Sequence, residues 1–298
     1  MLSIQNLNKT YGNGIHALRD ISLEIGPGIF GLLGPNGAGK SSLMRTLATL
    51  QDADSGSIAL DGISVLQAPR AARQRLGYLP QDFGVYPNVS AEELLHQLAV
   101  FKGFTDRKQR REVVNHQLWL VNLYEQRSQK LGTFSGGMRQ RFGIAQALLG
   151  SPRLVIVDEP TAGLDPTERI RFQNILADIS QDRVLLLSTH IVEDVAELCP
   201  NMAILQKGKI VRQGSPPSLI AALKGQVWAK RINNPSEINP YWRVITERMV
   251  RGDRTVRVWG ETCPEEGFCS VEPDLNDVYF TALLENPKAV ENPKAVVI

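Results

Sequence analysis

The chain has 298 residues, of which 43% are hydrophobic, and this length suits one large globular domain followed by a smaller one. Its 33 basic and 31 acidic residues leave a net charge of +2, which gives no argument for a nucleic-acid or membrane-surface partner. No apolar run approaches the roughly 20 residues that a membrane span requires, and no signal peptide is recognisable, so no part is expected to cross a membrane.

Two strands are expected first, over residues 4–7 and 21–25, as an antiparallel edge ahead of a glycine-rich loop. Tyr11 lies between them on a glycine turn. Two interpretations of Tyr11 stay open: its ring stacks on the adenine of a bound nucleotide, or it covers the core at the end of a strand.

The most informative stretch is the loop Gly34-Pro35-Asn36-Gly37-Ala38-Gly39-Lys40-Ser41, which follows an apolar run and precedes a helix-like segment. Strand, loop and helix in this order form a phosphate-binding loop, in which backbone N–H groups and the positive end of the helix bind phosphate oxygens. We expect Lys40 to bind the β- and γ-phosphates and Ser41 to ligate Mg²⁺. The alternative is a glycine turn without a ligand, which leaves the agreement of pattern and context unexplained.

The segments after this loop combine short strands with a block of helices. A helix is expected over residues 42–50 and strands over 57–62 and 76–81, with Gln81 where the last strand meets solvent. Ser90 and Glu93 form a capping box, and a further helix is expected from about 106 to 123. Residues 88–135 are therefore predicted to be a helical insertion, which ends at Ser135-Gly136-Gly137, a second helix start suited to anions.

Two buried strands then end in residues that suit chemistry. The apolar run 154–157 predicts a strand of a parallel sheet, with Asp158 and Glu159 at its carboxyl end. Such a pair is either a helix cap or, in a chain with a phosphate-binding loop, a Mg²⁺ site. A turn at Asp165 leads into another helix, and the strand over 184–189 ends at His190, at the edge where such sheets bind ligands. A histidine in this position, taken by itself, is more often a structural histidine with satisfied hydrogen bonds than a ligand-binding one.

The α/β pattern fades near residue 214, and strands over 227–232, 242–250 and 255–259 with a capped helix after Asp274 predict a small α+β domain over residues 221–285. Cys263 and Cys269 in this part lack the spacing of a zinc site and are interpreted as structural. With Cys199 they make an odd number of cysteines, which fits reduced thiols in a cytosol. The tail 286–298 repeats Glu-Asn-Pro-Lys-Ala-Val and is expected to be disordered.

The order of these motifs resembles that of the ATP-binding subunit of an ABC transporter, and the resemblance covers about residues 1–220. An aromatic loop, a phosphate-binding loop, a glutamine loop, a signature motif, an acidic pair, an aspartate loop and a switch histidine follow one another in the family order. The resemblance implies an α/β P-loop NTPase: a cassette with a mainly parallel core sheet, an antiparallel β subdomain and an α-helical subdomain, here with a small C-terminal α+β extension.

The resemblance also implies a mechanism in which two copies meet head to tail and enclose ATP between the P-loop of one and the signature motif of the other. Asp158 then supports Mg²⁺, Glu159 polarises the attacking water and His190 contacts the γ-phosphate, while Gln81 senses the Mg²⁺ and the water. The implied catalytic residues are Glu159, His190, Lys40 and Gln81, and the implied Mg²⁺ ligands are Ser41, Gln81 and Asp158. The implied nucleotide-binding residues are Tyr11, Gly34, Asn36, Gly37, Ala38, Gly39, Lys40, Ser41, Ser42, Ser135, Gly136, Gly137 and Asp165.

The signature departs from the family pattern at two positions. Met138 stands where the family commonly has glutamine, and Phe134 stands where it has leucine. The serine and the two glycines that bind phosphate remain, so we expect the site to be functional. A methionine at this position also resembles the signature of exporter subunits.

As partners the resemblance implies a second copy or a paralogous ATPase subunit, together with integral membrane permease subunits, and no nucleic acid. The protein is then cytoplasmic and peripheral, held at the inner face of the cell membrane by its permease partner. The loop 81–89 carries Phe83, Val85 and Tyr86 and is expected to dock on that partner, the alternative being that these side chains pack beneath the helical insertion.

Two other functions remain open. A soluble ABC ATPase that acts on nucleic acid or ribosomes usually has two fused cassettes or a long coiled-coil insertion, whereas this chain has one P-loop and one signature. A nucleotide-gated signalling module at the membrane is the other alternative. The sequence names no transported substrate and does not separate export from import, although the signature favours an exporter.

Overall fold

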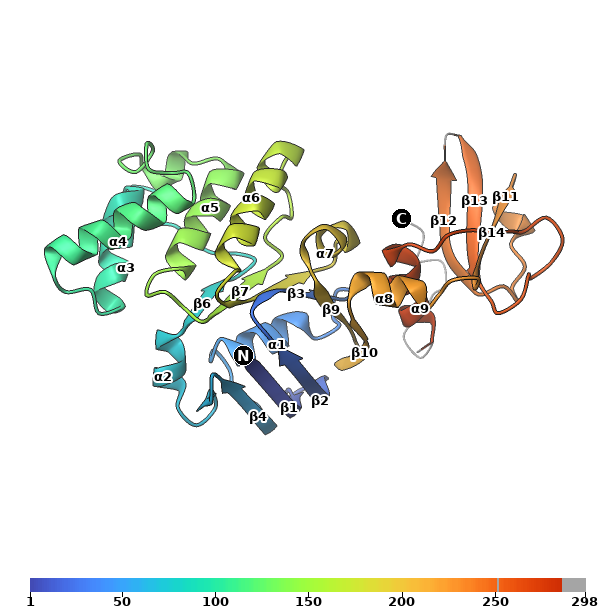
Figure 1. The fold of residues 1–298 in the computed structure, drawn as a ribbon, viewed down its shortest axis with the longest axis horizontal. Coiled ribbons are helices and arrows are strands. Elements are labelled where there is room, and N and C mark those ends of the chain that lie inside the picture. The colour runs from blue at the N-terminus through green and yellow to red at the C-terminus, as the bar shows by residue number, and fades with distance from the viewer. Residues whose placement is uncertain (251, 286–298) are drawn as a thin grey trace.

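The computed structural model describes residues 1–250 and 252–285. The disorder predicted for residues 286–298 lies outside the described residues. Within them the structure has three sheets, and the two in the larger part of the molecule lie next to each other (Figure 1). No helix in the described part of the chain has the length and apolar character that a membrane crossing needs.

The first sheet is antiparallel and has the strand order β2-β1-β4-β5. Its strands are β1 (Leu2–Thr10), β2 (His16–Ile25), β4 (Ser55–Leu60) and β5 (Ile63–Ser64). Buried and exposed residues alternate along the second half of β2, because one face of the sheet packs on the core and the other faces water. This sheet contains the two strands that the sequence predicted ahead of the glycine-rich loop, both longer than expected.

The central sheet has six strands in the order β10-β9-β3-β8-β7-β6 and is parallel except for β10. Its strands are β3 (Gly28–Leu33), β6 (Leu76–Leu79), β7 (Leu154–Asp158), β8 (Val184–Thr189), β9 (Asn201–Gln206) and β10 (Lys209–Gly214). Strands β7 and β8 are buried throughout, as their unbroken apolar runs predicted. Because β3, β6, β7 and β8 are parallel, the residues that follow them meet at one edge of the sheet.

Strands β9 and β10 were missing from the sequence-based expectations. The run Met202-Ala203-Ile204-Leu205 is completely buried, and its apolar character was the signal for β9. Lys207 and Gly208 form the turn between the two strands, with positive φ values of 48° and 77°.

Nine helices in the described residues surround the sheets. They are α1 (Lys40–Leu47), α2 (Pro69–Gln74), α3 (Ala91–Phe101), α4 (Arg107–Leu120), α5 (Gly136–Ala147), α6 (Pro166–Ile179), α7 (Val192–Leu198), α8 (Pro216–Ala221) and α9 (Leu275–Leu284). The predicted capping box at the start of α3 is confirmed, since Ser90 and Glu93 bond each other's backbone N–H groups. Short 3₁₀ turns lie at Leu131–Thr133 and Pro235–Glu237.

The third sheet belongs to the C-terminal part and has the order β12-β13-β11-β14. It consists of β11 (Val227–Ile232), β12 (Val244–Val250), β13 (Asp253–Trp259) and β14 (Cys269–Ser270). It lies at one end of the molecule, with α8 and α9 between it and the rest (Figure 1). Of its strands, the sequence missed only the two-residue β14.

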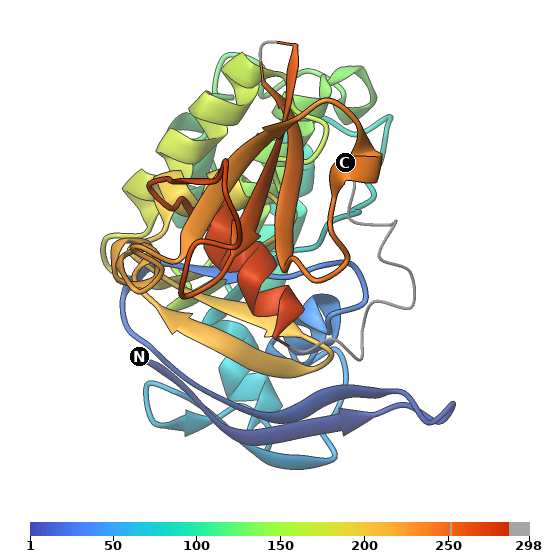
Figure 2. The same ribbon diagram turned by 90° about the vertical axis from the view of Figure 1, so that its right-hand side faces the viewer.

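Helix α9 joins this part to the larger one. Its apolar residues Leu275, Val278, Tyr279 and Ala282 belong to the same buried cluster as the helices and strands beside the central sheet. Gln206 of β9 donates through Nε2 to the Leu283 carbonyl oxygen over 3.1 Å. Figure 2 places α9 between the C-terminal sheet and the β9–β10 hairpin, so the apolar face that the sequence predicted is covered within this chain.

Candidate functional site

The phosphate-binding loop connects the end of β3 to the start of α1 and is pressed against its neighbours. A Cβ atom on Gly34 would lie 2.4 Å from the Leu205 carbonyl oxygen, and one on Gly39 would lie 2.4 Å from that of Ala17. Gly39 also has a φ of +108°, a conformation that L side chains rarely adopt. Glycine is therefore required at both positions, and the loop is fixed from behind by β2 and β9.

Lys40 is buried inside this loop. Its Nζ donates to the carbonyl oxygens of Gly34 over 2.7 Å and Pro35 over 3.3 Å, and lies 3.5 Å from Glu159 Oε1. Burial lowers the pKa of Lys40, while the negative charges of Glu159 and Asp158 favour its charged form. The ammonium group thus points at the oxygens of its own loop and at the acidic pair after β7.

Glu159 is the centre of the site. Its Oε2 lies 3.1 Å from His190 Nδ1 and accepts a hydrogen bond of 3.4 Å from Gln81 Nε2. Glu159 has a φ of +49°, and its N–H donates to the Ser188 carbonyl oxygen over 2.8 Å. The other three residues predicted as catalytic, Lys40, Gln81 and His190, follow three other strands and meet at this carboxylate.

Asp158 ends β7 and is buried beside this cluster. Burial raises the pKa of Asp158, and the negative charge of Glu159 adds to that shift. The Ser188 hydroxyl, the Lys40 ammonium group and the Ser41 hydroxyl oppose it by stabilising the charged form. Oxygen donors from a hydroxyl and a carboxylate suit Mg²⁺, which usually keeps waters and substrate phosphates as its other ligands. The described residues contain no group of three or more His, Cys, Asp or Glu side chains that could hold a metal ion.

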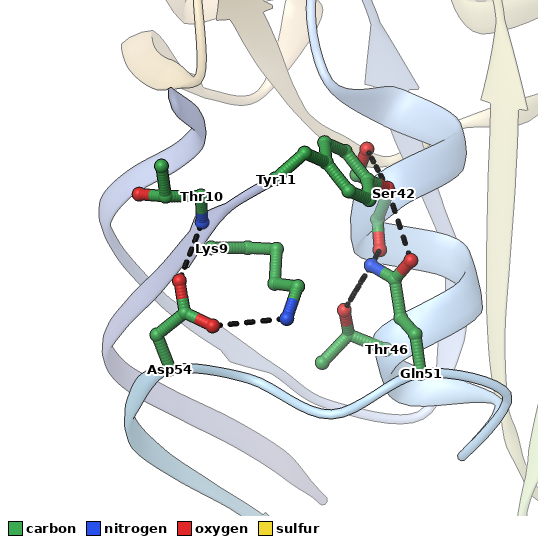
Figure 3. A network of polar contacts seen from close by, with 7 residues as sticks. All are labelled: Lys9, Thr10, Tyr11, Ser42, Thr46, Gln51 and Asp54. Carbon is green, nitrogen blue, oxygen red and sulfur yellow. Dashed lines mark hydrogen bonds and ion pairs between the residues drawn. The ribbon is translucent and has the colours of Figure 1, made fainter. Parts of the chain in front are cut away.

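Tyr11 is held beside the first turns of α1 (Figure 3). Its hydroxyl lies 3.0 Å from Ser42 Oγ and donates to Gln51 Oε1 over 3.0 Å. Gln51 in turn donates to the Ser42 carbonyl oxygen and to Thr46 Oγ1 over 2.9 and 2.8 Å. These bonds fix the tyrosine next to the phosphate-binding loop, and its stacking on adenine stays a prediction.

The signature residues form a separate turn. Ser135 caps α5 by accepting a hydrogen bond of 3.2 Å from the Met138 N–H, and Gly136 and Gly137 form the first turn of the helix. Asp165 caps α6 in the same way, through a bond of 2.9 Å from the Glu168 N–H. Across residues 1–250 and 252–285, no hydrogen bond or ion pair joins either cap to the cluster around Glu159.

The sequence analysis missed Asp194, a buried carboxylate in α7 that contacts the loop after Glu159 and the helix after Asp165. The available signal was an acidic residue between Val192 and Val195, on the buried side of a short helix.

Some apolar side chains of the loop 81–89 pack on the core, and one is exposed. Phe83 and Val85 pack against the large core cluster, so for these two side chains the packing alternative holds. Tyr86 is 68% exposed and remains available to a partner.

The cysteines are free, with Cys199 buried and Cys263 and Cys269 exposed. The structure gives the two exposed thiols no metal partner within the described residues.

Comparison with known proteins identifies relatives of this chain. The sequence model of the ABC transporter family matches residues 18–162. An uncharacterised ABC transporter ATP-binding protein of Bacillus subtilis, YxlF, is 36% identical over 215 residues, which cover 72% of this chain and 70% of the relative. The linearmycin resistance ATP-binding protein LnrL of the same organism is 34% identical over 230 residues, or 76% and 72% of the two chains.

One relative extends over the C-terminal part as well. The Nod factor export ATP-binding protein I of Rhizobium sp. (strain N33) is 32% identical over an alignment of 305 positions, which spans 98% of this chain and 94% of that protein. Among solved structures, a dimeric ATP-binding cassette in a post-hydrolysis state with bound ADP and Pi aligns with a TM-score of 0.65 and 25% identity. That alignment covers 72% of this chain and 98% of the solved one.

Proposed function

This chain belongs to the ABC transporter family as an ATP-binding subunit, and on that premise we propose that it pairs with a second ATPase subunit and drives export through separate permease subunits. The chain is an ATPase with the cassette fold of its family. The finer assignment of residues, partners and direction is our proposal. It rests above all on the Glu159 carboxylate, which lies within reach of Lys40, Gln81 and His190.

Lys40 and the phosphate-binding loop hold the β- and γ-phosphates of ATP. The Lys40 ammonium group now donates to the loop carbonyls of Gly34 and Pro35, so binding exchanges these neutral acceptors for charged phosphate oxygens. Ser41, Asp158 and Gln81 would hold Mg²⁺, which would supply positive charge to neutralise the phosphates. Tyr11 and Ser42 complete the nucleotide site on the side of α1.

Glu159 orients the water that attacks the γ-phosphate. Its Oε1 faces Lys40, and its Oε2 faces Gln81 and His190. When Lys40 turns to the phosphates, Oε1 becomes free to accept a proton from water, while His190 still fixes the other oxygen. This division of the two carboxylate oxygens is the chemical reason for assigning the role to Glu159 rather than to Asp158.

A second copy, or a paralogous subunit, completes the site. Ser135, Gly136 and Gly137 form a helix start suited to phosphate, yet no polar contact within residues 1–250 and 252–285 links them to Lys40 or Glu159. The head-to-tail pair of the family brings the partner's signature turn and Asp165 turn to the phosphate-binding loop. Residues 1–220 form the catalytic cassette in this proposal, and residues 221–285 stabilise or regulate the pair.

The first experiment replaces Glu159 with glutamine, which keeps the size of the side chain and removes its charge. Glu159→Gln should bind ATP normally, lose most turnover and remain as an ATP-bound pair in gel filtration. Glu112→Gln is the matched control, because Glu112 is exposed on α4. Turnover of Glu159→Gln close to that of the control would contradict the assignment.

Export through a permease rests on the relatives and on the exposed Tyr86. Two relatives are named for Nod factor export and linearmycin resistance, which supports export as the direction. Tyr86 lies on the loop after Gln81, so a permease that docks there senses the nucleotide site and holds the chain at the cytoplasmic face of the membrane.

Cross-linking in native membranes tests this docking. A cysteine at Tyr86, in a chain whose Cys263 and Cys269 are serine, should capture an integral membrane protein. Tyr241→Cys is the control, since Tyr241 is 93% exposed but belongs to the C-terminal part. Equal capture from both positions, or none from Tyr86, would remove the support for docking.

A further inference from the structure

Asp194 of α7 is completely buried, with 0% of its surface exposed, and its carboxylate is fully engaged. Oδ2 accepts a hydrogen bond of 2.5 Å from the Thr161 hydroxyl. Oδ1 accepts bonds of 2.9 Å from Arg169 Nε and 3.1 Å from Gln173 Nε2. A carboxylate at this depth is tolerated only with such partners, because removing an ion from water costs several kcal/mol.

The partners of Asp194 come from segments that carry candidate site residues. Thr161 is two residues after Glu159, and Arg169 is four residues after Asp165, within the helix that Asp165 caps. Asp194 itself is four residues after His190. One buried carboxylate therefore ties together the three chain segments that position Glu159, Asp165 and His190.

Packing alone does not explain an acid at this position. The neighbouring residues Val192 and Val195 are buried apolar side chains, and a buried ion pair is often no more stabilising than apolar residues of similar volume. The carboxylate adds directional bonds: Oδ2 holds the loop after Glu159 through Thr161, and Oδ1 holds helix α6 through Arg169 and Gln173. Thr161 and Arg169 occupy different oxygens, so neither replaces the other.

We propose that Asp194 is a positioning residue for ATP hydrolysis, which holds the loop after Glu159, helix α6 and helix α7 as one body. The inference rests on the proposed roles of Glu159 and His190. The polar partners of Asp194 among the described residues are Thr161, Arg169 and Gln173, so it acts on Glu159 and His190 only through the segments that carry them. The resemblance places the partner subunit at the Asp165 turn. Because Asp194 links the three segments, a displacement of this turn also moves Glu159 and His190, and the intervening loops do not absorb it.

The test compares two variants of Thr161 that differ in one group. Thr161→Ser keeps the hydroxyl that donates to Asp194, whereas Thr161→Val keeps the volume and removes it. We expect Thr161→Val to lower kcat by about 10- to 100-fold, as small misplacements of catalytic groups do, with the KM for ATP little changed. Thr161→Ser should retain wild-type kcat, and Asp194→Asn should resemble Thr161→Val.

A stability control separates positioning from folding. Val195→Ala creates a cavity in the same helix without touching the carboxylate, so it should lower the melting temperature while the folded protein keeps its kcat. The double variant Thr161→Val with Asp194→Asn should be no slower than the slower single variant, because both remove the same link.

Two results would overturn the inference. One is wild-type kcat in a folded Thr161→Val, and the other is an equal loss of kcat in Val195→Ala. If Asp194→Asn does not fold, the Thr161 pair still decides. A Glu159→Gln variant that hydrolyses ATP normally would instead contradict the proposed function, independently of these results.

Discussion

Replacing Arg257 with methionine removes one half of a buried ion pair in the C-terminal part. Asp277 of α9 has no exposed surface, and its carboxylate accepts bonds from both Nε and Nη2 of Arg257, the first over 2.9 Å. It also accepts a bond of 2.8 Å from the Asp274 N–H, which starts α9. Methionine keeps the length of the arginine stem and leaves this carboxylate without its cation.

The expected loss in the free energy of unfolding is large for the replacement of one residue, Arg257. Breaking a buried pair by removing one partner costs about 3–5 kcal/mol, because an uncompensated charge stays behind. Lysine at this position keeps the charge but not the two-pronged geometry, and should cost about 1.5–3 kcal/mol, the value of one hydrogen bond to a charged group. Arg257→Met combined with Asp277→Leu should be less destabilised than Arg257→Met alone, even though it also loses the cap.

Tryptophan fluorescence during urea unfolding is the assay. Of the four tryptophans, Trp228, Trp242 and Trp259 lie in the C-terminal part, and Trp119 is 70% exposed in the folded chain. The change in emission therefore reports on the C-terminal sheet, and a shift of its midpoint at constant slope measures the lost stability. A loss of less than about 1 kcal/mol in the free energy of unfolding of Arg257→Met would refute the reasoning. So would a double variant that is less stable than Arg257→Met alone.

The remaining predictions concern nucleotide, thiols and chain length. Lys40→Ala should abolish tight ATP binding, and unchanged affinity in a nucleotide titration would contradict the role of the phosphate-binding loop. Cys263 and Cys269 are exposed and should react rapidly with a thiol reagent. Cys199 is buried, which raises the pKa of its thiol to about 12, so it should react only after unfolding. Cutting the chain after Gly225 should weaken pairing, measured by gel filtration, while each pair that forms keeps its ATP turnover in an ATPase assay. Removing residues 286–298 should change neither the pairing nor the turnover.

Local patterns predicted much of the fold and of the site. The cap of α3 at Ser90 depends on residues within one helical turn, and the continuous apolar run of β7 depends only on burial, so both could be read from short windows. The fold class implied by the order of motifs is confirmed by the solved cassettes. The ends of β3, β6, β7 and β8 converge as parallel strands must.

What the sequence left open depends on contacts between distant segments. Nothing near Lys40 predicts that its ammonium group rests on the Gly34 and Pro35 carbonyls, because that requires the folded loop. The partners of Asp194 lie 21 to 33 residues away in the chain. Phe83 looked like a docking residue from its loop position, yet it packs on α5 at Gly143, where an added Cβ would lie 2.7 Å from the ring.

The position of α9 in the chain has a consequence for biosynthesis. Its residues are among the last of the described chain to be translated, yet they cover an apolar side of the core next to α7 and β9. Domains begin to fold from the N-terminal end while synthesis continues, so the growing cassette keeps this side uncovered until α9 has left the ribosome. A chain that stops before α9 therefore displays the kind of surface that chaperones bind, and in the complete fold α9 covers it.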